Sequence, residues 1–386
     1  MKRLIHIFSC HSVLIACLIS LGIGITTANA SPVTNGWSLE DGTWYYYSSG
    51  QRTTGWLNLN NTWYYLTQEG KMVTGWLNDN GTWYYLSESG AMQTGWVSYK
   101  DNWYYLSSSG AMQTGWVYDN GLWYYMSGNG DMITGWFNDN GTWYYLTDSG
   151  AMLTGWLSYK DDWYYLSPSG AMDVEWGYIS GKWYFFSPSG AMLTGWQQAN
   201  QKWYYFYDSG EMAYNTTIDG YVLEISGAWT PSGERTETVA IWVNKQMNCV
   251  TIYADNSAIK SMICSTGPVT PIGTYSIGQK YRWHALIHNS YGQYCSRIVG
   301  QILFHSVPYN STNIYDLQGA EYNKLGTSAS AGCIRLSVED AKWIYDNCPS
   351  GTTVTIYNSD NAGALGKPSS ITIPDGQTWD PTDPEL

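Results

Sequence analysis

The chain is poor in basic residues. Its 386 residues include 18 Lys and Arg against 31 Asp and Glu, a formal net charge of −13. Removal of the first 30 residues would take away Lys2 and Arg3 and change the balance to 16 minus 31, or −15. Such an acidic chain argues against nucleic acid, and against any anionic polymer held through lysine or arginine.

Long apolar runs are confined to the N-terminus. Met1-Lys2-Arg3 is followed by an apolar stretch to Ile25 and then by Ala28-Asn29-Ala30. A positive start, an apolar middle and an A-x-A ending are typical of a secretory signal peptide, cleaved here after Ala30. A lipoprotein anchor at Cys17 fits less well, because the apolar run continues past it. No later stretch is long and apolar enough to span a bilayer, so we expect a secreted protein.

Histidine and cysteine are scarce. Beyond residue 30 the histidines are His284, His288 and His305. The first two are four residues apart, a spacing that can hold a metal on a helix, but no HExxH motif or obvious third ligand accompanies them. We therefore expect no metal and assign both to a cleft wall or to structure. An odd number of cysteines remains, which leaves at least one free thiol: Cys249, Cys264, Cys295, Cys333 and Cys348.

Two of these cysteines flank a predicted hairpin turn at 255–258. With that turn, Cys249 lies opposite Cys264 on the adjacent strand, near bonding distance. The alternative is a pair of buried, small apolar residues, and the sequence does not separate the two interpretations.

Aromatic residues are abundant and periodic, with 23 Trp and 35 Tyr in the chain. From Gly36 to about Met212 a tryptophan is followed seven residues later by another, which opens a Trp-Tyr-Tyr or a close variant. After the first step the repeat is a constant 20 residues, a periodicity typical of a solenoid. The nine units begin at Trp37, Trp56, Trp76, Trp96, Trp116, Trp136, Trp156, Trp176 and Trp196.

One unit shows what each repeat folds into. With Asn80-Gly81 as a two-residue turn, Trp76 faces Tyr85 and Asn78 faces Trp83 in a hairpin. An isolated hairpin is marginal, so the units must stack. Because side chains alternate along a strand, one face holds Trp76, Trp83 and Tyr85, and the other holds Leu77, Tyr84 and Leu86.

The face with two tryptophans has two interpretations. The aromatic rings can simply build the core of a thin solenoid, which is our assignment for Leu77, Tyr84 and Leu86. Alternatively, they form cages that attract quaternary ammonium through the ring quadrupoles, or platforms on which sugars stack. The acidic charge modestly favours the cation.

A second motif lies near the C-terminus, where Gly332-Cys333-Ile334-Arg335 follows small residues. Ser337 and Asp340 form a capping pattern for a helix that ends before Pro349. Cys333 is therefore predicted at a strand-to-helix junction, where backbone N–H groups can lower a thiol pKa and stabilise an oxyanion. The candidate base is His305, at the end of a predicted buried strand.

The stretch Ser330–Arg335, with His305-Ser306 upstream, resembles the active-site signature of the YkuD-type L,D-transpeptidases. The resemblance extends from about Val239 to Tyr357 and includes the turn Thr270–Tyr275. This chain has Ala331 where many members have histidine. We also expect an inserted loop at 310–324, because the separation between His305 and Cys333 is long.

This resemblance implies a mechanism without a cofactor. His305, oriented by the Ser306 carbonyl, takes the proton of Cys333, or the two form a thiolate–imidazolium pair. The sulfur attacks the carbonyl after the diamino-acid residue of a peptidoglycan tetrapeptide and expels D-Ala, with backbone N–H groups of Gly332 and Cys333 holding the oxyanion. The amine of a second stem completes a 3→3 cross-link. Arg335 binds a substrate carboxylate or braces the loop, with a buried ion pair as the equal alternative.

Two other functions stay open. Water as the acceptor would make the protein an L,D-carboxypeptidase that trims tetrapeptide stems. A wall-binding protein with a decayed catalytic domain is the second alternative, although the presence of both Cys333 and His305 argues against decay.

The repeats resemble the choline-binding, or cell-wall-binding, repeats of Gram-positive surface proteins, which also occur in glucan-binding enzymes. Choline-bearing teichoic acid and glucan are thus the expected partners. Glu175-Trp176-Gly177 and Gln197-Gln198 break the pattern, so the last units are predicted to cap the solenoid. The resemblance implies sites at Trp76, Trp83 and Tyr105 with Met92; at Trp56, Trp63 and Tyr85; and at Trp96, Trp103 and Tyr125, with Met112 nearby.

The predicted fold is mostly β: a hairpin solenoid followed by an L,D-transpeptidase-like β-rich domain with a helix after Cys333. We expect a wall-associated protein of the Gram-positive type. The predicted parts are a signal peptide at 1–30, nine repeats at 31–212, a connector at 213–238, a catalytic domain at 239–357 and a tail at 358–386.

Overall fold

The computed structural model describes residues 35–386, so the predicted signal peptide lies outside the described residues. Their regular secondary structure is almost entirely β, as predicted. The described residues divide into two compact units, residues 35–119 with 125–132, and residues 120–124 with 133–386. Within residues 35–386, no helix has the length and apolar character needed to cross a membrane.

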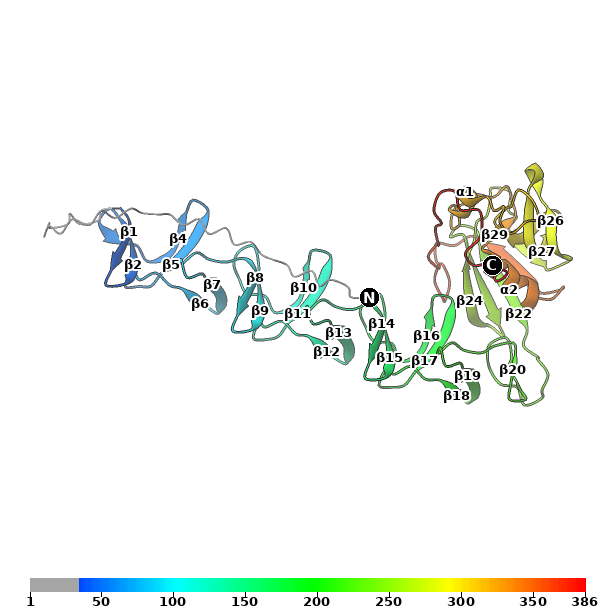
Figure 1. Cartoon of the computed structure of the whole chain (residues 1–386), viewed down its shortest axis with the longest axis horizontal. Helices are drawn as coiled ribbons and strands as arrows, with labels where there is room; N and C mark the ends of the chain where they lie inside the picture. Colours follow the sequence, from blue (N-terminus) through cyan, green and yellow to red (C-terminus); the bar gives the residue numbers. More distant parts are fainter. Residues whose placement is uncertain (1–34) are drawn as a thin grey trace. The chain divides into compact units, whose positions relative to one another are not determined.

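The N-terminal unit is a succession of β-hairpins (Figure 1). In one of them Trp76 pairs with Tyr85 and Asn78 pairs with Trp83, which confirms the predicted register. The Asn80-Gly81 turn has φ of 51° and 88°, the left-handed values that this two-residue turn requires. The strands are β1 (Gly36–Glu40), β2 (Thr43–Ser48), β3 (Gln51–Arg52), β4 (Gly55–Leu59), β5 (Thr62–Leu66), β6 (Gly75–Asp79), β7 (Thr82–Leu86), β8 (Gly95–Tyr99) and β9 (Asn102–Leu106), with β10 (Gly115–Asp119) and β11 (Leu122–Met126) following.

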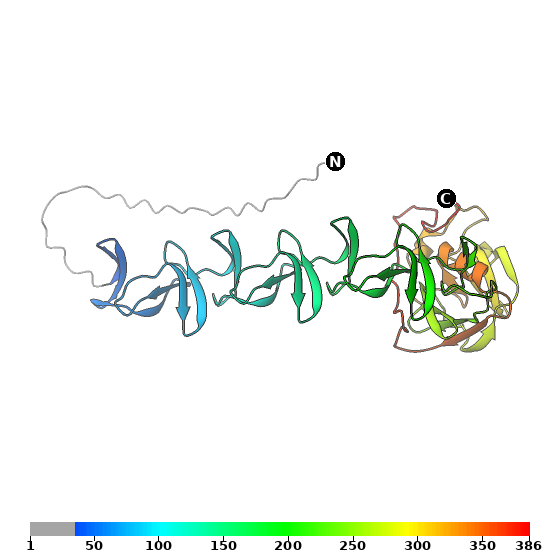
Figure 2. The ribbon, with the colours of Figure 1, turned by 90° about the horizontal axis from the view of Figure 1, so that it is seen from below.

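Successive hairpins join through the segment after each second strand. Met112 N–H donates to the Trp83 carbonyl oxygen of the preceding hairpin at 2.8 Å, and Met112 also bridges to Leu106. Gly110 has φ of +84°, and a Cβ there would lie 2.4 Å from Met92 Sδ. The glycine of the repeat is thus needed both for the turn and for the methionine that packs on it. Figure 2 shows that consecutive hairpins of this unit are turned relative to one another.

The second unit begins with the same kind of hairpin and continues it further than predicted. Trp229 N–H donates to the Trp203 carbonyl oxygen at 2.7 Å, just as Met212 N–H donates to Trp183 at 2.8 Å. Leu223 is fully buried and bridges to Trp229. The predicted connector therefore contains a shortened repeat. The strands are β12 (Gly135–Asp139), β13 (Thr142–Leu146), β14 (Gly155–Tyr159), β15 (Asp162–Leu166), β16 (Glu175–Ile179), β17 (Lys182–Phe186), β18 (Gly195–Ala199), β19 (Lys202–Phe206), β20 (Thr217–Ile218) and β21 (Tyr221–Val222).

Two sheets and two α-helices follow. The five-stranded sheet has the order β24-β23-β22-β30-β25, and the four-stranded sheet has the order β26-β27-β28-β29. The elements are β22 (Val239–Asn244), β23 (Cys249–Ala254), β24 (Ser257–Ile263), β25 (Gly273–Ser276), β26 (Lys280–Ala285), a 3-10 turn η1 (Ile287–Asn289), β27 (Tyr291–Val299), β28 (Ile302–Ser306), α1 (Gly319–Tyr322), β29 (Ile334–Leu336), α2 (Val338–Asn347) and β30 (Thr353–Tyr357).

The helix after Cys333 forms where the capping pattern placed it. The Ser337 hydroxyl accepts from Asp340 N–H at 3.2 Å, so the predicted cap is confirmed. Buried Ala341 and Ile344 of α2 pack into one core with residues of both sheets. This packing fixes the short strand β29, and with it the cysteine loop.

Residues 358–386 have no helix or strand assigned, as predicted, but they are fastened to the catalytic region. The fully buried Asp380 accepts from Val338 N–H at 2.9 Å, at the start of α2. Asp383 accepts from Gln293 Nε2 at 3.0 Å. The segment is thus a largely exposed strap that a few buried residues, Asp380 and Asp383 among them, hold on the domain.

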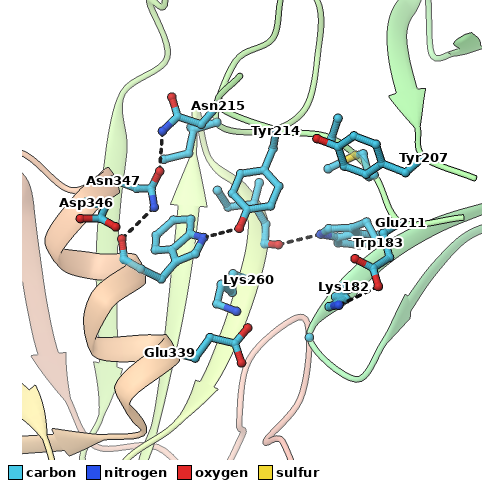
Figure 3. Close-up of a pocket in the computed structure, with 16 residues that line it drawn as sticks. Lys182, Trp183, Tyr207, Glu211, Tyr214, Asn215, Lys260, Glu339, Asp346 and Asn347 are labelled. Atoms are coloured by element: carbon cyan, nitrogen blue, oxygen red, sulfur yellow. Dashed lines mark hydrogen bonds and ion pairs between the residues drawn. The ribbon is translucent and has the colours of Figure 1, made fainter. Parts of the chain in front are cut away.

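The pattern break at 175–177 has a structural reason. The hairpin β16–β17 packs on β24, where Tyr178 OH accepts from Ser261 N–H at 2.8 Å and Trp183 Nε1–H donates to the Ile259 carbonyl oxygen at 2.6 Å. Gly177 takes the place of a larger residue because a Cβ there would lie 2.8 Å from the Phe186 ring. Figure 3 shows Trp183 at a cavity of about 490 Å³ that this contact leaves beside α2.

The predicted pairing of Cys249 with Cys264 is wrong by one residue. The turn is two residues long, at 255–256, instead of the predicted four, and with the β-bulge between Ile252 and Tyr253 this register pairs Cys249 with Ile263. Both cysteines are buried free thiols.

Candidate active site and aromatic cages

The parallel pair β28–β29 brings the candidate catalytic residues together. His305 pairs with Arg335, and Phe304 pairs with Ile334. Phe304 and Ile334 point into the core. Side chains alternate along a strand, so His305, Arg335 and the preceding Cys333 share the opposite face of the sheet.

The Cys333 thiol is partly exposed and lies against a turn. Its Sγ donates to the Gln301 carbonyl oxygen at 3.5 Å. Burial raises the pKa of the Cys333 thiol above its usual value, and the Leu303 backbone, Arg335 and Arg297 oppose that effect without reversing it. The strand-to-helix junction predicts a lowered thiol pKa, and this prediction is wrong because burial outweighs the Leu303 backbone contact and the two arginine charges. The thiol is therefore protonated at neutral pH and needs a base.

His305 has the properties of that base. The ring is buried, and its Nδ1 lies 2.6 Å from the Ser306 carbonyl oxygen. A carbonyl can only accept, so Nδ1 carries the proton and Nε2 keeps its lone pair. Burial lowers the pKa of His305 to about 4, although the Ser306 contact acts in the opposite direction. A neutral imidazole with a free Nε2 can accept a thiol proton, and Gly292 leaves the room for it, since a Cβ there would lie 3.0 Å from Nδ1.

The loop before Cys333 is held by contacts with the segment 267–270. Thr270 Oγ1 donates to the Gly332 carbonyl oxygen at 2.7 Å, and a Cβ on Gly267 would lie 2.1 Å from the Ser330 carbonyl oxygen. Gly332 N–H already donates to Ser330 Oγ at 3.1 Å. This N–H is therefore already hydrogen-bonded within the loop. To hold an oxyanion, as predicted, Gly332 N–H has to give up its bond to Ser330 Oγ.

Arg335 forms the ion pair that the sequence left as one alternative. Its Nη1 lies 2.6 Å from Glu321 Oε2, and its side chain is only 15% exposed. Burial alone would raise the pKa of Glu321, but hydrogen bonds from Lys324 and Arg335 outweigh it and lower that pKa. Glu321 lies on α1, inside the predicted inserted loop 310–324. The insertion thus supplies the partner that braces Arg335.

The other two histidines lie on different elements, one on a strand and the other in a turn. His284 is on β26, where its ring stacks on Tyr281 with centroids 4.3 Å apart. Burial lowers the pKa of His284, and Arg297 lowers it further. His288 lies in the turn η1 with φ of 57°. Because β26 is a strand, these two residues do not share a helix face. Within residues 35–386 no group of three or more His, Cys, Asp and Glu is placed to hold a metal.

The ring contacts between neighbouring hairpins involve a different tyrosine from the one predicted to close each cage. The rings of Trp76 and Trp83 have centroids 6.4 Å apart, and Trp76 lies 4.8 Å from Tyr104 of the next hairpin. Tyr105 instead packs on Trp96, at 5.0 Å, within its own hairpin. Likewise Trp56, which lies 6.3 Å from Trp63, meets Tyr84 at 4.8 Å. The adjacent Tyr85 packs on Trp76 and Tyr125 packs on Trp116.

This arrangement changes one assignment. Tyr84, which we assign to the core, instead contacts Trp56 of the preceding hairpin. The methionines connect successive hairpins: Met92 bridges to Leu86 and donates its N–H to the Trp63 carbonyl oxygen, and Met112 N–H donates to that of Trp83. The remaining predicted pair, Trp96 and Trp103, has ring centroids 6.5 Å apart. Trp63, Trp83 and Trp103 are 43–46% exposed, so each pair presents a ring to solvent.

The end of the repeats holds a cage that the sequence did not indicate. Trp196, Trp203, Tyr221 and Trp229 line a cavity of about 310 Å³. Tyr221 lies 5.4 Å from Trp196, and Trp229 lies 5.9 Å from Tyr221. Trp229 takes the methionine's place in the repeat. The Gly227-Ala228-Trp229 spacing after Leu223 was the available signal, but the unit is three residues short of the 20-residue period.

The fold and site define a modular protein in which aromatic hairpin repeats precede a β-rich domain with a cysteine and a histidine on one sheet face. Residues 238–356 match the L,D-transpeptidase catalytic domain. Residues 53–94, 93–135, 133–175 and 174–216 match the choline-binding repeat. The chain is 34% identical over 145 residues to YciB of Bacillus subtilis (strain 168), a protein assigned by name to the L,D-transpeptidases; the match covers 33% of this chain and 73% of YciB. The chain therefore belongs to the L,D-transpeptidase family and carries choline-binding repeats.

Solved structures resemble the repeats. CbpJ from Streptococcus pneumoniae TIGR4 is 32% identical, with a TM-score of 0.42, over 51% of this chain and 93% of CbpJ. Choline binding protein F from Streptococcus pneumoniae is also 32% identical, with a TM-score of 0.39, over 51% of this chain and 92% of that protein.

Proposed function

We propose that the protein is a secreted cell-wall enzyme that forms 3→3 peptidoglycan cross-links through a Cys333 acyl-enzyme. The observation that carries this proposal is the buried, neutral His305, whose Nδ1 is fixed on the Ser306 carbonyl on the sheet face that also carries Cys333. The catalytic-domain match supports the reaction class. In this proposal residues 1–30 direct secretion, 31–212 bind the wall, 213–238 connect, 239–357 catalyse and 358–386 strap the catalytic domain.

The reaction proceeds in two acyl transfers. As Cys333 Sγ attacks the carbonyl of the diamino-acid residue, its proton passes to His305 Nε2. The tetrahedral intermediate collapses, the bond to the terminal D-Ala breaks, and His305 returns the proton to the leaving amine. The amine of a second stem then attacks the thioester. It gives up a proton to His305, which passes it to the departing Cys333 sulfur.

The oxyanion has one preferred donor in this proposal. Gly332 N–H is hydrogen-bonded to Ser330 Oγ, so we assign Cys333 N–H as the main hydrogen-bond donor to the oxyanion. This assignment requires only that the attacked carbonyl lie over the loop. Gly332 joins when the Ser330 hydroxyl turns away.

The experiment is mass spectrometry of tetrapeptide muropeptides incubated with the purified chain. We expect a 3→3 dimer and free D-Ala, and neither product with the Cys333→Ala variant. Tripeptide monomers without dimers would replace the transpeptidase assignment by an L,D-carboxypeptidase. No product from an intact, folded protein would indicate a decayed catalytic domain.

The repeats are proposed to dock this enzyme on a choline-bearing polymer of a Gram-positive wall. A ring pair such as Trp76 and Trp83, closed by Tyr104, offers faces that attract quaternary ammonium. The match to the choline-binding repeat supports this ligand over glucan. Retention of the chain on α-glucan, with no response to choline, would reverse the choice.

A further inference from the structure

The turn between β27 and β28 is contacted by two functional groups. Cys333 Sγ donates to the Gln301 carbonyl oxygen at 3.5 Å. Arg297 Nη1 donates to the carbonyl oxygen of the preceding residue, Gly300. The thiol and the guanidinium therefore lie on adjacent peptide units of one turn.

Strand register places the same two residues in one row. Arg297 pairs with Leu303 across β27 and β28. Ile334 pairs with Phe304 in the parallel pair β28–β29, so Cys333 comes next to Leu303. Residues in register across neighbouring strands project from the same face of a sheet. Arg297 thus lies on the Cys333 face, in agreement with its effect of lowering the pKa of both Cys333 and His284.

The two arginines on this face differ in what they can still bind. Arg335 is committed to Glu321 in a partly buried ion pair. Arg297 has neutral partners, since in residues 35–386 its guanidinium bonds to the Gly300 carbonyl and to Tyr281 OH at 3.2 Å. A guanidinium has five N–H donors, so these contacts orient Arg297 and leave its charge and further donors for an incoming anion.

We propose that Arg297 is a carboxylate-binding residue that recognises the free C-terminal carboxylate of the donor peptide. This inference rests on the proposed function, in which the attacked carbonyl is followed by one terminal residue. That carboxylate lies about one residue, or roughly 3.8 Å of chain, beyond the attacked bond. Arg297 contacts the peptide unit next to the one that Cys333 contacts, so its guanidinium lies on the side of the thiol where a short extension of the donor could meet it. Arginine can hold a carboxylate through two parallel hydrogen bonds.

The test is the binding of two synthetic donors to the full chain with Cys333→Ala, measured by calorimetry. One tetrapeptide ends in a free carboxylate and the other in a carboxamide. We expect the acid to bind about 10- to 100-fold more tightly, as a charge-assisted pair contributes. Arg297→Gln in the same background should reduce this acid-to-amide ratio to less than about threefold, and Arg297→Lys should give an intermediate ratio.

A matched control separates recognition from folding. Arg282→Gln removes a guanidinium on the adjacent strand that is paired with Glu385, and it should leave the ratio unchanged. A ratio unaffected by Arg297→Gln, or a parent that binds acid and amide equally or not at all, overturns the inference. The proposed function has its own test. If wild-type protein makes no product from muropeptides, that function is wrong, whereas the acid-to-amide binding ratio still decides the role of Arg297.

Discussion

His305 is a base whose buried environment sets its working range. Burial lowers the pKa of His305 to about 4, so the ring is neutral and able to accept a proton above that pH. We expect the acid limb of kcat/KM against pH to fall near pH 4, well below the usual histidine value of about 6.5. An acid limb near 6.5 would show that the ring titrates as if it were exposed.

The same burial predicts how stability depends on pH. In the unfolded chain His305 has a pKa of about 6.5, so between about pH 4 and 6.5 the unfolded state binds more protons. The free energy of unfolding should therefore fall as the pH is lowered through this window. Urea titrations at pH 7 and pH 4.5 should show the difference, and His305→Gln should make it smaller.

Replacing His305 tests its assignment directly. His305→Gln should cut kcat by about 10²–10⁴-fold, the range expected when a general base is lost. Rates of D-Ala release measure the effect. His284→Ala and His288→Ala are the controls, and both should be milder. If His284→Ala loses most D-Ala release while His305→Gln keeps it, the base is misassigned.

Neighbouring tyrosines of one repeat should have separable roles. Tyr104 closes the ring pair of Trp76 and Trp83, whereas Tyr105 packs on Trp96. Tyr104→Ala should remove the choline site at that pair. Calorimetric stoichiometry measures this loss, and Trp83→Ala is the matched variant. If Tyr105→Ala removes this site while Tyr104→Ala does not, Tyr105 is the third ring of the site and Tyr104 is not.

At the scale of elements, the hairpin β16–β17 is adapted to hold the catalytic domain. Tyr178 occupies a position that is Asn or Ser in five other repeats and is also tyrosine in the repeat that begins at Trp116. Its hydroxyl bonds both to Ser261 N–H, at 2.8 Å, and to the Ser261 carbonyl, at 3.3 Å. Tyr178→Phe leaves these backbone groups without that partner and should lower the free energy of unfolding by about 1–3 kcal/mol.

Thermal unfolding monitored by circular dichroism measures this change. Tyr315→Phe is the control, because that ring is 57% exposed. Equal stability of the two variants would show that water replaces the Tyr178 hydroxyl and that the contact does not stabilise the fold.

At the scale of the whole molecule, weak cages should add up to tight retention. Each cation–ring contact contributes about 0.5–2 kcal/mol, so one site alone is weak. Several sites on one chain raise the effective concentration of a choline-bearing polymer. The full chain should stay on a tertiary-amine resin until free choline elutes it. Deleting pairs of repeats should reduce retention steeply, and a reduction in simple proportion would argue against multivalent binding.

Much of this protein is determined by the sequence itself. The 20-residue period, the Asn80-Gly81 turn and the alternation of faces fix the hairpin register, because these interactions are local. Ser337 and Asp340 fix the start of α2 in the same way. The motif around Cys333, together with His305, indicates the family, because small residues, a thiol and a base at set places form a specific local pattern.

Contacts between distant residues were decided only by the tertiary structure. Whether Tyr104 or Tyr105 meets Trp76 depends on how one hairpin turns relative to the next, which periodicity does not specify. The raised pKa of Cys333 depends on burial that outweighs nearby donors, and the partner of Arg335 comes from an inserted loop. The position of Arg297 beside the thiol depends on the pairing of strands and on one shared turn. Sequence fixes local geometry, whereas burial and cross-strand neighbours are collective properties of the folded chain.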